Sequence, residues 1–485
     1  MSWLTKLGAI AQQYYLSLLA GPLLFLLTLA TEPAFSGMSG SAWMISGLTA
    51  WMALWWITEP VPIPITALLP IIMVPLLSLD SISNVTAPYA HPLIFLFLGG
   101  FILSIAMERW NLHKRIALLT MLLVGSKPSQ QVAGIMLVTA FLSMWMSNTA
   151  TAVMMLPIGL SVIAMQQERG VSNDNFAKAI LLSIAYAASI GGVATLIGTP
   201  PNALLAAYLE RSYQIQLSFS DWMLFGVPLS VSLLVVCWLW LTQFHFKLDN
   251  ISAVDSKSLY RDKLAALGPM HNAEKLVLLV FLSAAFCWVF RGPLSNLTGI
   301  KLDDTLIAIF AASLLFILPA SLKTGQRILQ WEDCQKLPWG VLLLFGGGLT
   351  LASQIDNSGL SAYIAAQIGQ LGSINLLLLI VLVTTVIIFL TEITSNTATA
   401  AAFLPLLGPV AVSLDTSAAM LVIPAAVAAS CAFMMPVATP PNAIVFASGK
   451  LKIIDMVKAG LVLNLVAIVL ITLAVLYLAR YIFRF

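Results

Sequence analysis

The chain has 485 residues, of which 60% are hydrophobic and 9% charged, whereas soluble domains are roughly 45–50% apolar and about 25% charged. This composition indicates an integral membrane protein and leaves no room for a large soluble domain. The 23 basic and 20 acidic residues give a net charge of only +3 without a basic run, which excludes nucleic-acid binding. Four cysteines without CxxC spacing and four histidines outside any HExxH pattern favour neither a zinc site nor an enzyme.

The apolar residues form helix-length runs and not alternating stretches of about ten residues, so the expected fold is an all-α polytopic membrane protein. Eleven candidate spans follow in chain order, at 14–31, 41–58, 62–79, 92–108, 178–209, 222–246, 275–290, 303–320, 340–355, 417–449 and 459–480. The fifth and the tenth exceed the length of about 20 residues that one span needs, and both contain Pro-Pro. We therefore expect these two spans to be broken.

Two further apolar stretches, 108–178 and 356–417, are interrupted midway by Ser-Asn-Thr. Each remaining arm is about 16 residues long, which is short for a full crossing. A polar tip between short arms favours a re-entrant hairpin, whose irregular backbone must be buried in protein or face a water-filled cavity. A pair of full spans would also return the chain to the same side, so the topology alone does not separate the two.

The distribution of lysine and arginine predicts the orientation of the chain. With the amino terminus in the cytoplasm, this layout places 18 of the 23 basic residues on the cytoplasmic side. We therefore expect a protein of a bacterial-type inner membrane with a cytoplasmic amino terminus. On that side, 108–127 is typical of an amphipathic surface helix or of an ordinary charged connection, and 247–275 is typical of a linker helix.

The two interrupted stretches belong to an internal repeat. Ser147-Asn148-Thr149 recurs as Ser395-Asn396-Thr397, an offset of 395 − 147 = 248 residues. Further on, the sequence Thr-Pro-Pro-Asn at 199–202 recurs at 439–442, an offset of 240 residues. Five expected crossings separate the two Ser-Asn-Thr tips, and because this number is odd, the repeat is expected to be inverted. Inverted repeats with interrupted helices at matching positions indicate a secondary transporter, with an anion channel as a minor alternative.

The repeated motifs predict a binding site for an anion. Thr-Pro-Pro-Asn indicates a helix that restarts within the membrane, because threonine caps helices and proline favours their first position. If all four breaks converge, four helix amino termini face one cavity. The side chains of Asn148, Thr149, Asn396 and Thr397 would then offer one set of donors to each end of a two-headed substrate.

The motifs contain no lysine or arginine, so a dianion needs a mobile cation. Backbone carbonyls with Ser, Thr and Asn oxygens form an environment that suits Na⁺. Glu392 lies three residues before Ser395 and could carry a proton, but a hydrogen-bonded structural acid is the favoured interpretation.

At these motifs the sequence resembles the divalent anion/sodium symporter family, the INDY-type carriers, over nearly the whole chain. The resemblance implies a homodimer with eleven spans and two re-entrant hairpins per protomer, working by an elevator mechanism. It implies a scaffold formed by 1–127 and 275–372, a transport domain formed by 128–246 and 373–485, and a cytoplasmic linker at 247–274.

The resemblance also implies site residues. One sodium site would use Ser143, Ser147, Asn148 and the backbone at Gly198, and the second would use Thr391, Thr394, Asn396 and the backbone at Ala438. Substrate contacts would come from Asn148, Thr149, Thr199, Asn396, Thr397, Thr439 and Pro440.

The sequence thus predicts Na⁺-coupled symport of a C4-dicarboxylate such as succinate, fumarate or malate. A sodium-independent exchanger of dicarboxylate or citrate is the alternative. The sequence leaves the cargo open among dicarboxylate, tricarboxylate and sulfate.

Overall fold

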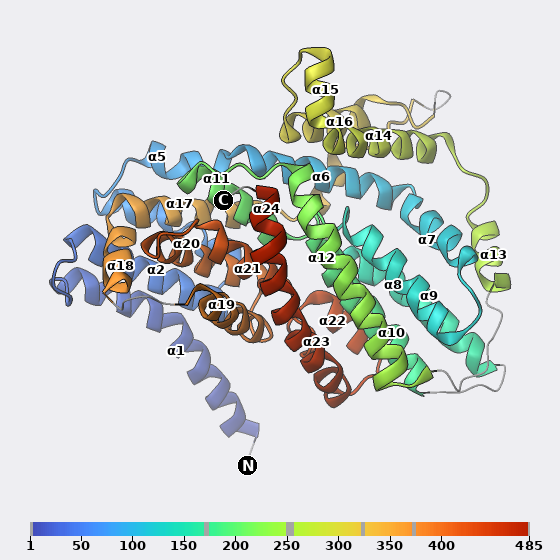
Figure 1. The fold of residues 1–485 in the computed structure, drawn as a ribbon, viewed down its shortest axis with the longest axis horizontal. Helices are drawn as coiled ribbons and strands as arrows, with labels where there is room; N and C mark the ends of the chain where they lie inside the picture. The colour runs from blue at the N-terminus through green and yellow to red at the C-terminus, as the bar shows by residue number, and fades with distance from the viewer. Residues whose placement is uncertain (1–2, 169–173, 249–256, 322–324, 371–374, 484–485) are drawn as a thin grey trace.

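A computed structural model describes residues 3–168, 174–248, 257–321, 325–370 and 375–483. The described chain is helical, and its strand pairing is limited to one isolated bridge between Pro319 and Arg327. Most of the helices lie side by side in an elongated bundle, from one edge of which α1 projects (Figure 1). The α-helices are α1 (Trp3–Ala30), α2 (Gly40–Thr58), α3 (Ile63–Thr66), α4 (Leu69–Leu76), α5 (Ile82–Thr86), α6 (Pro92–Arg109), α7 (Leu112–Leu123), α8 (Pro128–Ser143), α9 (Asn148–Glu168), α10 (Asp174–Val193), α11 (Pro200–Tyr213), α12 (Phe219–Leu239), α13 (Lys257–Ala266), α14 (Asn272–Val289), α15 (Arg291–Thr298), α16 (Asp304–Ile317), α17 (Trp339–Asn357), α18 (Leu360–Gly369), α19 (Leu376–Thr391), α20 (Asn396–Ser413), α21 (Ala419–Ala429), α22 (Pro440–Phe446), α23 (Ile453–Leu473) and α24 (Arg480–Phe483).

Local sequence signals set where many of these helices begin. Ser39 and Asn375 cap α2 and α19 by accepting hydrogen bonds from the amides of Ala42 and Leu378. Proline occupies the first position of α6, α8, α11 and α22, where its missing N–H costs no intrahelical bond. Capping side chains and first-position prolines in the sequence therefore set these helix starts.

Among the described residues, seven helical segments are long and apolar enough to cross a membrane: Ile82–Arg109, Asn148–Glu168, Asp174–Val193, Phe219–His245, Asn272–Val289, Asn396–Ser413 and Ile453–Phe483. The protein is therefore an integral membrane protein. All eleven expected segments contain helix, but the number of crossings stays a prediction. The expected span 62–79 consists of two short helices, α3 and α4. The prolines at 70 and 75 lie in the second of these.

The two expected spans with Pro-Pro are broken as predicted. The fifth is divided into α10, which ends at Val193, and α11, which begins at Pro200. The tenth is divided into α21, which ends at Ala429, and α22, which begins at Pro440. Each break leaves a non-helical segment between two helices.

The Ser-Asn-Thr motifs likewise separate helices, with α8 and α9 on either side of the first tip and α19 and α20 on either side of the second. The first arms have the expected 16 residues. The second arms are longer than expected, at 21 and 18 residues, because α9 continues to Glu168 and α20 to Ser413. Arm length therefore does not by itself distinguish a re-entrant hairpin from a pair of spans.

Both segments predicted as cytoplasmic connections contain helix. α7 buries one face, including Leu112, Ala117 and Met121, so the stretch 108–127 contains an amphipathic helix. Arg115 on α7 forms an ion pair with Glu274 at 2.5 Å, and its guanidinium donates to the Gly268 carbonyl at 3.0 Å. The linker contains α13, while its residues 249–256 and the expected domain boundary at 372 lie outside the described residues.

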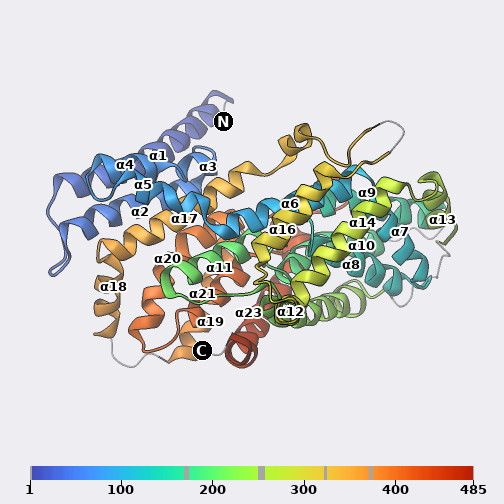
Figure 2. The ribbon, with the colours of Figure 1, turned by 90° about the horizontal axis from the view of Figure 1, so that it is seen from above.

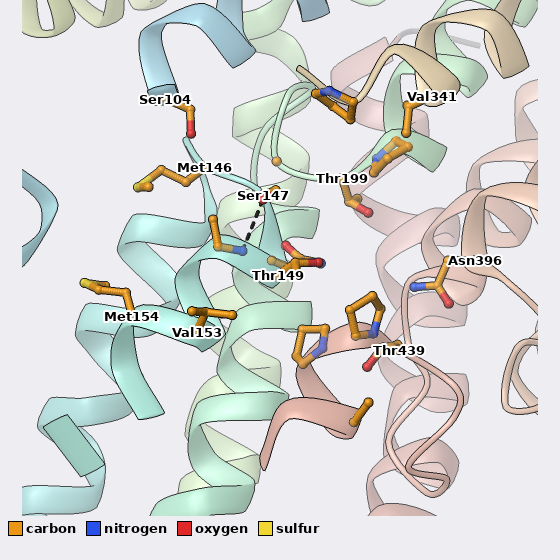
Figure 3. A pocket seen from close by; sticks show the side chains of 18 of the residues that line it. Ser104, Met146, Ser147, Thr149, Val153, Met154, Thr199, Val341, Asn396 and Thr439 are labelled. Atoms are coloured by element: carbon orange, nitrogen blue, oxygen red, sulfur yellow. Dashed lines mark hydrogen bonds between the residues drawn. The ribbon is translucent and has the colours of Figure 1, made fainter. Parts of the chain in front are cut away.

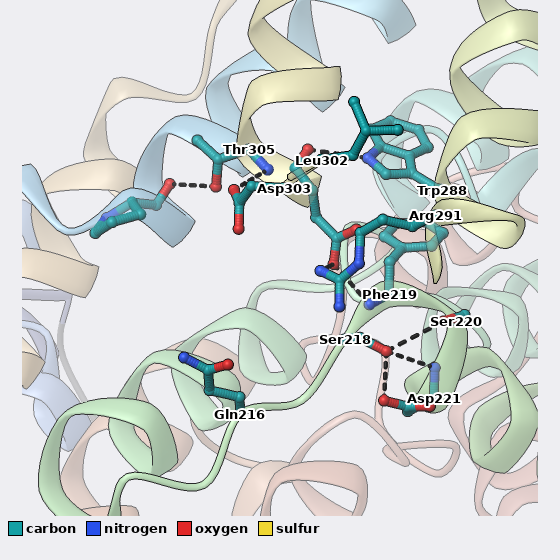
Figure 4. Close-up of polar contacts among 12 residues, drawn as sticks. Gln216, Ser218, Phe219, Ser220, Asp221, Trp288, Arg291, Leu302, Asp303 and Thr305 are labelled. Atoms are coloured by element: carbon teal, nitrogen blue, oxygen red, sulfur yellow. Dashed lines mark hydrogen bonds and ion pairs between the residues drawn. The ribbon is translucent and has the colours of Figure 1, made fainter. Parts of the chain in front are cut away.

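The start of α12 is joined to α14 and α16, which lie along one face of the bundle (Figures 1 and 2). The Phe219 amide donates to Asp304 at 2.8 Å, and Arg291 pairs with the same carboxylate at 3.0 Å (Figure 4). The ring of Phe219 stacks on Trp288 with centroids 4.7 Å apart, and Trp145, beside the first tip, stacks on both. These contacts tie the first tip to helices that are far away in the sequence.

Candidate functional site

The four helix breaks converge on one cavity of about 1,600 Å³. Its lining includes the first tip, the second tip and the segments that precede α11 and α22, namely 146–150, 197–200, 393–397 and 437–441. Figure 3 shows Ser147, Thr149, Thr199, Asn396 and Thr439 around the same space. The predicted anion site required all four breaks to converge on one cavity, and the structure shows that they do.

A hydroxyl and an amide fix the backbone of the first tip. The Ser143 hydroxyl oxygen, in the last turn of α8, lies within hydrogen-bond distance of Asn148 Oδ1 (2.6 Å) and of the Ala188 carbonyl oxygen (2.7 Å), and its single proton bridges these two acceptors. Ser147 accepts a hydrogen bond from the Ala150 amide at 3.2 Å and thereby caps the start of α9 (Figure 3). The Asn148 oxygen keeps a second lone pair that could ligate a cation, and its Nδ2 group can donate to an anion.

The second tip has the same arrangement. The Thr391 hydroxyl oxygen lies 2.7 Å from Asn396 Oδ1 and 3.0 Å from the Ala429 carbonyl oxygen, with one proton between these two acceptors. In addition, Thr394 and Thr399 exchange a hydrogen bond at 2.7 Å. The hydroxyls at 143 and 391 are separated by the same 248 residues as the two tips, so the sequence repeat extends to matching hydrogen bonds.

The asparagines of the two Thr-Pro-Pro-Asn motifs hold the broken backbone. Asn202 donates from Nδ2 to the carbonyls of Gly192, Val193 and Thr195 at 2.8–3.3 Å. Asn442 donates to the carbonyls of Ala432 and Met435 at 3.2 and 3.0 Å. Sequence reasoning used these residues only as part of a motif and missed this role. Their recurrence in both copies was the signal that could have found it.

The two breaks also contact each other, because the hydroxyl oxygens of Thr199 and Ser430 are 3.4 Å apart. Ser430 was not among the expected site residues. It occupies the end of α21, so this contact joins the first break to the second.

The structure brings most of the expected residues to the cavity. Ser147, Asn148, Thr149, Gly198, Thr199, Thr394, Asn396, Thr397, Ala438, Thr439 and Pro440 line it. Ser143 and Thr391 do not line it but lie behind the tips, where each holds its asparagine. Two expected sodium ligands, Asn148 Oδ1 and the Gly198 carbonyl oxygen, lie close to Gly192. A Cβ at position 192 would be 2.7 Å from the first and 3.0 Å from the second, so only glycine fits there.

Several polar atoms beside the tips are buried without a protein partner. They are Thr151 Oγ1, Ser189 Oγ, Asn202 Oδ1 and Asn442 Oδ1. Buried polar oxygens usually have a partner, and oxygen donors of this kind suit a hard cation. The donor chemistry around both tips therefore fits Na⁺.

The charged residues of the lining come from segments other than the tips and breaks. Lys114, Lys263 and Lys336 line the cavity together with Glu59 and Glu108, whereas the lining parts of the tips and breaks carry no charged side chain. Burial raises the pKa of Glu59. An anion at the tips would therefore meet only neutral donors and helix amino termini.

The comparisons with known proteins agree with this arrangement. Residues 12–483 match the family described as the sodium:sulfate symporter transmembrane region. The chain belongs to this family. It is 44% identical to the sodium-dependent dicarboxylate transporter SdcS of Staphylococcus saprophyticus over 95% of this chain and 90% of that protein. It is 43% identical to SdcS of Staphylococcus aureus strain USA300, again over 95% and 90% of the two chains.

A solved structure shares the fold. The YdaH transporter of Alcanivorax borkumensis superposes with a TM-score of 0.57 at 16% identity, over 88% of this chain and 97% of that one. The family resemblance expected from the motifs is thus confirmed, and its members are transporters and not enzymes.

We predict that Asn202→Ala lowers the stability of the protein by roughly 1–3 kcal/mol, because carbonyls of the first break lose their buried donor. Thermal unfolding of the purified protein in detergent would measure this. Asn442→Ala should behave alike, whereas Asn296→Ala, at an exposed position on α15, should leave the melting temperature unchanged. Equal melting temperatures for Asn202→Ala and Asn296→Ala would contradict the role assigned to Asn202.

Proposed function

We propose that this protein is a Na⁺-coupled symporter that imports a C4-dicarboxylate such as succinate, fumarate or malate. The observation that carries the proposal is the meeting of four helix breaks around one cavity, to which the tips and breaks contribute polar donors but no cationic side chain. The 44% identity to a sodium-dependent dicarboxylate transporter supports both the ion and the substrate class.

The substrate site lies between the tips. Asn148 and Thr149 face one carboxylate, and Asn396 and Thr397 face the other. Thr199, Thr439 and Pro440 complete the site from the broken helices. Amide and hydroxyl donors with helix amino termini stabilise carboxylate oxygens without a buried lysine or arginine.

Sodium supplies the missing positive charge. The first ion binds among Ser143, Ser147, Asn148 and the Gly198 carbonyl, and the second among Thr391, Thr394, Asn396 and the Ala438 carbonyl. At least two Na⁺ are needed to balance one dianion. Because Asn148 and Asn396 belong to both kinds of site, bound sodium orders the tips before the dianion is captured.

The cavity lies between the two units expected from the resemblance. The tips and breaks come from 128–246 and 373–485, whereas Phe101, Ser104 and Val341 line it from the expected scaffold. We propose an inverted repeat and an elevator movement, in which the loaded transport unit slides along the scaffold. The contact of Phe219 with Asp304 and Trp288 joins the two units, so this movement must break it.

The structure corresponds to an inward-open state if the amino terminus is cytoplasmic, as proposed. The charged residues of the cavity lining, including Lys114, Lys263 and Lys336, fall on the side that the positive-inside rule assigns to the cytoplasm. The bacterial-type inner membrane, the eleven spans and the homodimer are parts of the same proposal.

Uptake into liposomes tests the function. Vesicles without internal dicarboxylate should accumulate labelled succinate when an inward Na⁺ gradient is applied, and choline should not replace Na⁺. Asn148→Ala or Asn396→Ala should abolish uptake without loss of folded protein, because each removes ligands of both ion and substrate. Asn296→Ala serves as the matched control and should transport normally.

Three results would contradict the proposal. Uptake that requires preloaded dicarboxylate and ignores Na⁺ would identify an exchanger. Currents too large for a turnover cycle would identify a channel. Normal rates in both tip variants would refute the site assignment.

The proposed state and orientation predict one-sided labelling of the first tip. In a background without the four native cysteines, a Thr149→Cys variant should react with a membrane-impermeant maleimide from the cytoplasmic side, because Thr149 is exposed in the cavity. Right-side-out vesicles without substrate should show little labelling and inverted vesicles should show rapid labelling. The opposite result would reverse the assigned orientation or state.

A further inference from the structure

Glu392 is a buried acid at the end of α19, between two residues of the proposed second sodium site. Its side chain is 3% exposed. The carboxylate accepts hydrogen bonds from the amides of Phe433, Met434 and Met435 at 2.8–3.1 Å. Asn464 on α23 donates from Nδ2 at 2.7 Å. The sequence favours a hydrogen-bonded structural acid here, and the structure confirms it.

The three amides belong to the break between α21 and α22. One carboxylate thus fixes three successive residues of unwound backbone. From the other side, Asn442 donates to the carbonyls of Ala432 and Met435. The Met435 carbonyl also accepts from the Ala438 amide at 3.2 Å. A continuous set of hydrogen bonds therefore leads from Glu392 to the backbone of the second sodium site.

The surroundings of Glu392 fit a charged carboxylate. Each of its hydrogen-bond partners among the described residues is an N–H donor, which is the environment that an anionic acceptor requires. Among the described residues, no lysine or arginine forms an ion pair with it. Because its neighbours Thr391 and Thr394 are proposed sodium ligands, a cation bound there would interact with this negative charge.

At the first proposed sodium site, no acid occupies the position equivalent to Glu392 in the repeat. The offset between the tips places Met144 opposite Glu392, since 392 − 248 = 144. The Met144 carbonyl accepts from Thr195 at 2.5 Å, and the Trp222 indole donates to the Val193 carbonyl at 3.0 Å. Neutral groups therefore hold the first break, and the two halves differ in charge although their tips match.

We propose that Glu392 is a positioning residue that holds the second sodium site in its ion-binding shape and makes it the tighter of the two. This inference rests on the proposed function and deepens it, because it ranks the two sites. Sodium then binds first at the second tip and only afterwards at the first tip.

The test compares two buried glutamates. Glu392→Gln keeps the size of the side chain but removes the charge, whereas Glu274→Gln changes an equally buried glutamate that pairs with Arg115 away from the tips. The thermal stability of full-length protein in detergent is measured against Na⁺ concentration without dicarboxylate, with choline keeping the ionic strength constant. We expect the Na⁺ concentration for half-maximal stabilisation to rise about tenfold in Glu392→Gln. It should not change in Glu274→Gln, even if the melting temperature falls.

Variants of the tips assign the affected site. The tighter phase of sodium stabilisation should persist in Ser143→Ala and disappear in Thr391→Ala. The reverse pattern would overturn the ranking of the two sites. Equal sodium dependence in Glu392→Gln and Glu274→Gln would overturn the role of Glu392.

If Glu392→Gln does not fold, Asn464→Leu removes one donor from the same carboxylate. We expect a rise of about threefold in the Na⁺ requirement, and no rise would overturn the inference. Liposome uptake distinguishes failure of the role of Glu392 from failure of the proposed sodium-coupled symport. Sodium-driven uptake with no effect of these variants on sodium binding would refute this inference alone, whereas uptake without sodium would refute the proposed function as well.

Discussion

The site depends on one constraint: a helix that stops inside a membrane protein must still satisfy its backbone N–H and C=O groups. Two asparagines and one glutamate meet much of this requirement. Asn202 and Asn442 bind carbonyls of the two breaks, and Glu392 binds three amides of the second. Because these partners are buried and fixed, the breaks keep a defined shape without a bound ligand. That shape brings the tips and the restarted helices around one cavity.

The distribution of charge explains why the proposed cycle needs a cation. The charged side chains of the cavity lining come from other segments, and the tips and breaks contribute no charged side chain to it. A dianion placed there without sodium would exchange its hydration shell for neutral partners only. Desolvation of the uncompensated charge would then cost free energy. Sodium bound behind each tip would offset this cost and order the residues that contact the substrate. Coupling then follows from electrostatics, because neither ligand binds well without the other.

The sequence predicted the parts of the structure that depend on local chemistry. Proline after threonine indicated where α11 and α22 restart, and Ser-Asn-Thr indicated where α9 and α20 begin. The pattern of apolar residues could not predict how far α9 extends, since its last three residues are Gln166, Gln167 and Glu168. Ser143 and Thr391 entered only through the family resemblance. The partners of Asn202 and the stack of Trp145, Phe219 and Trp288 depend on long-range packing, which a single sequence does not specify.

The central claim is that both repeated tips bind one dianion together with sodium. An experimental structure of the protein with Na⁺ and succinate tests it most directly. The account predicts density for one succinate between residues 147–149 and 395–397, with an ion beside each tip. Succinate bound at the lysines of the cavity lining, or density at one tip without the other, would contradict it.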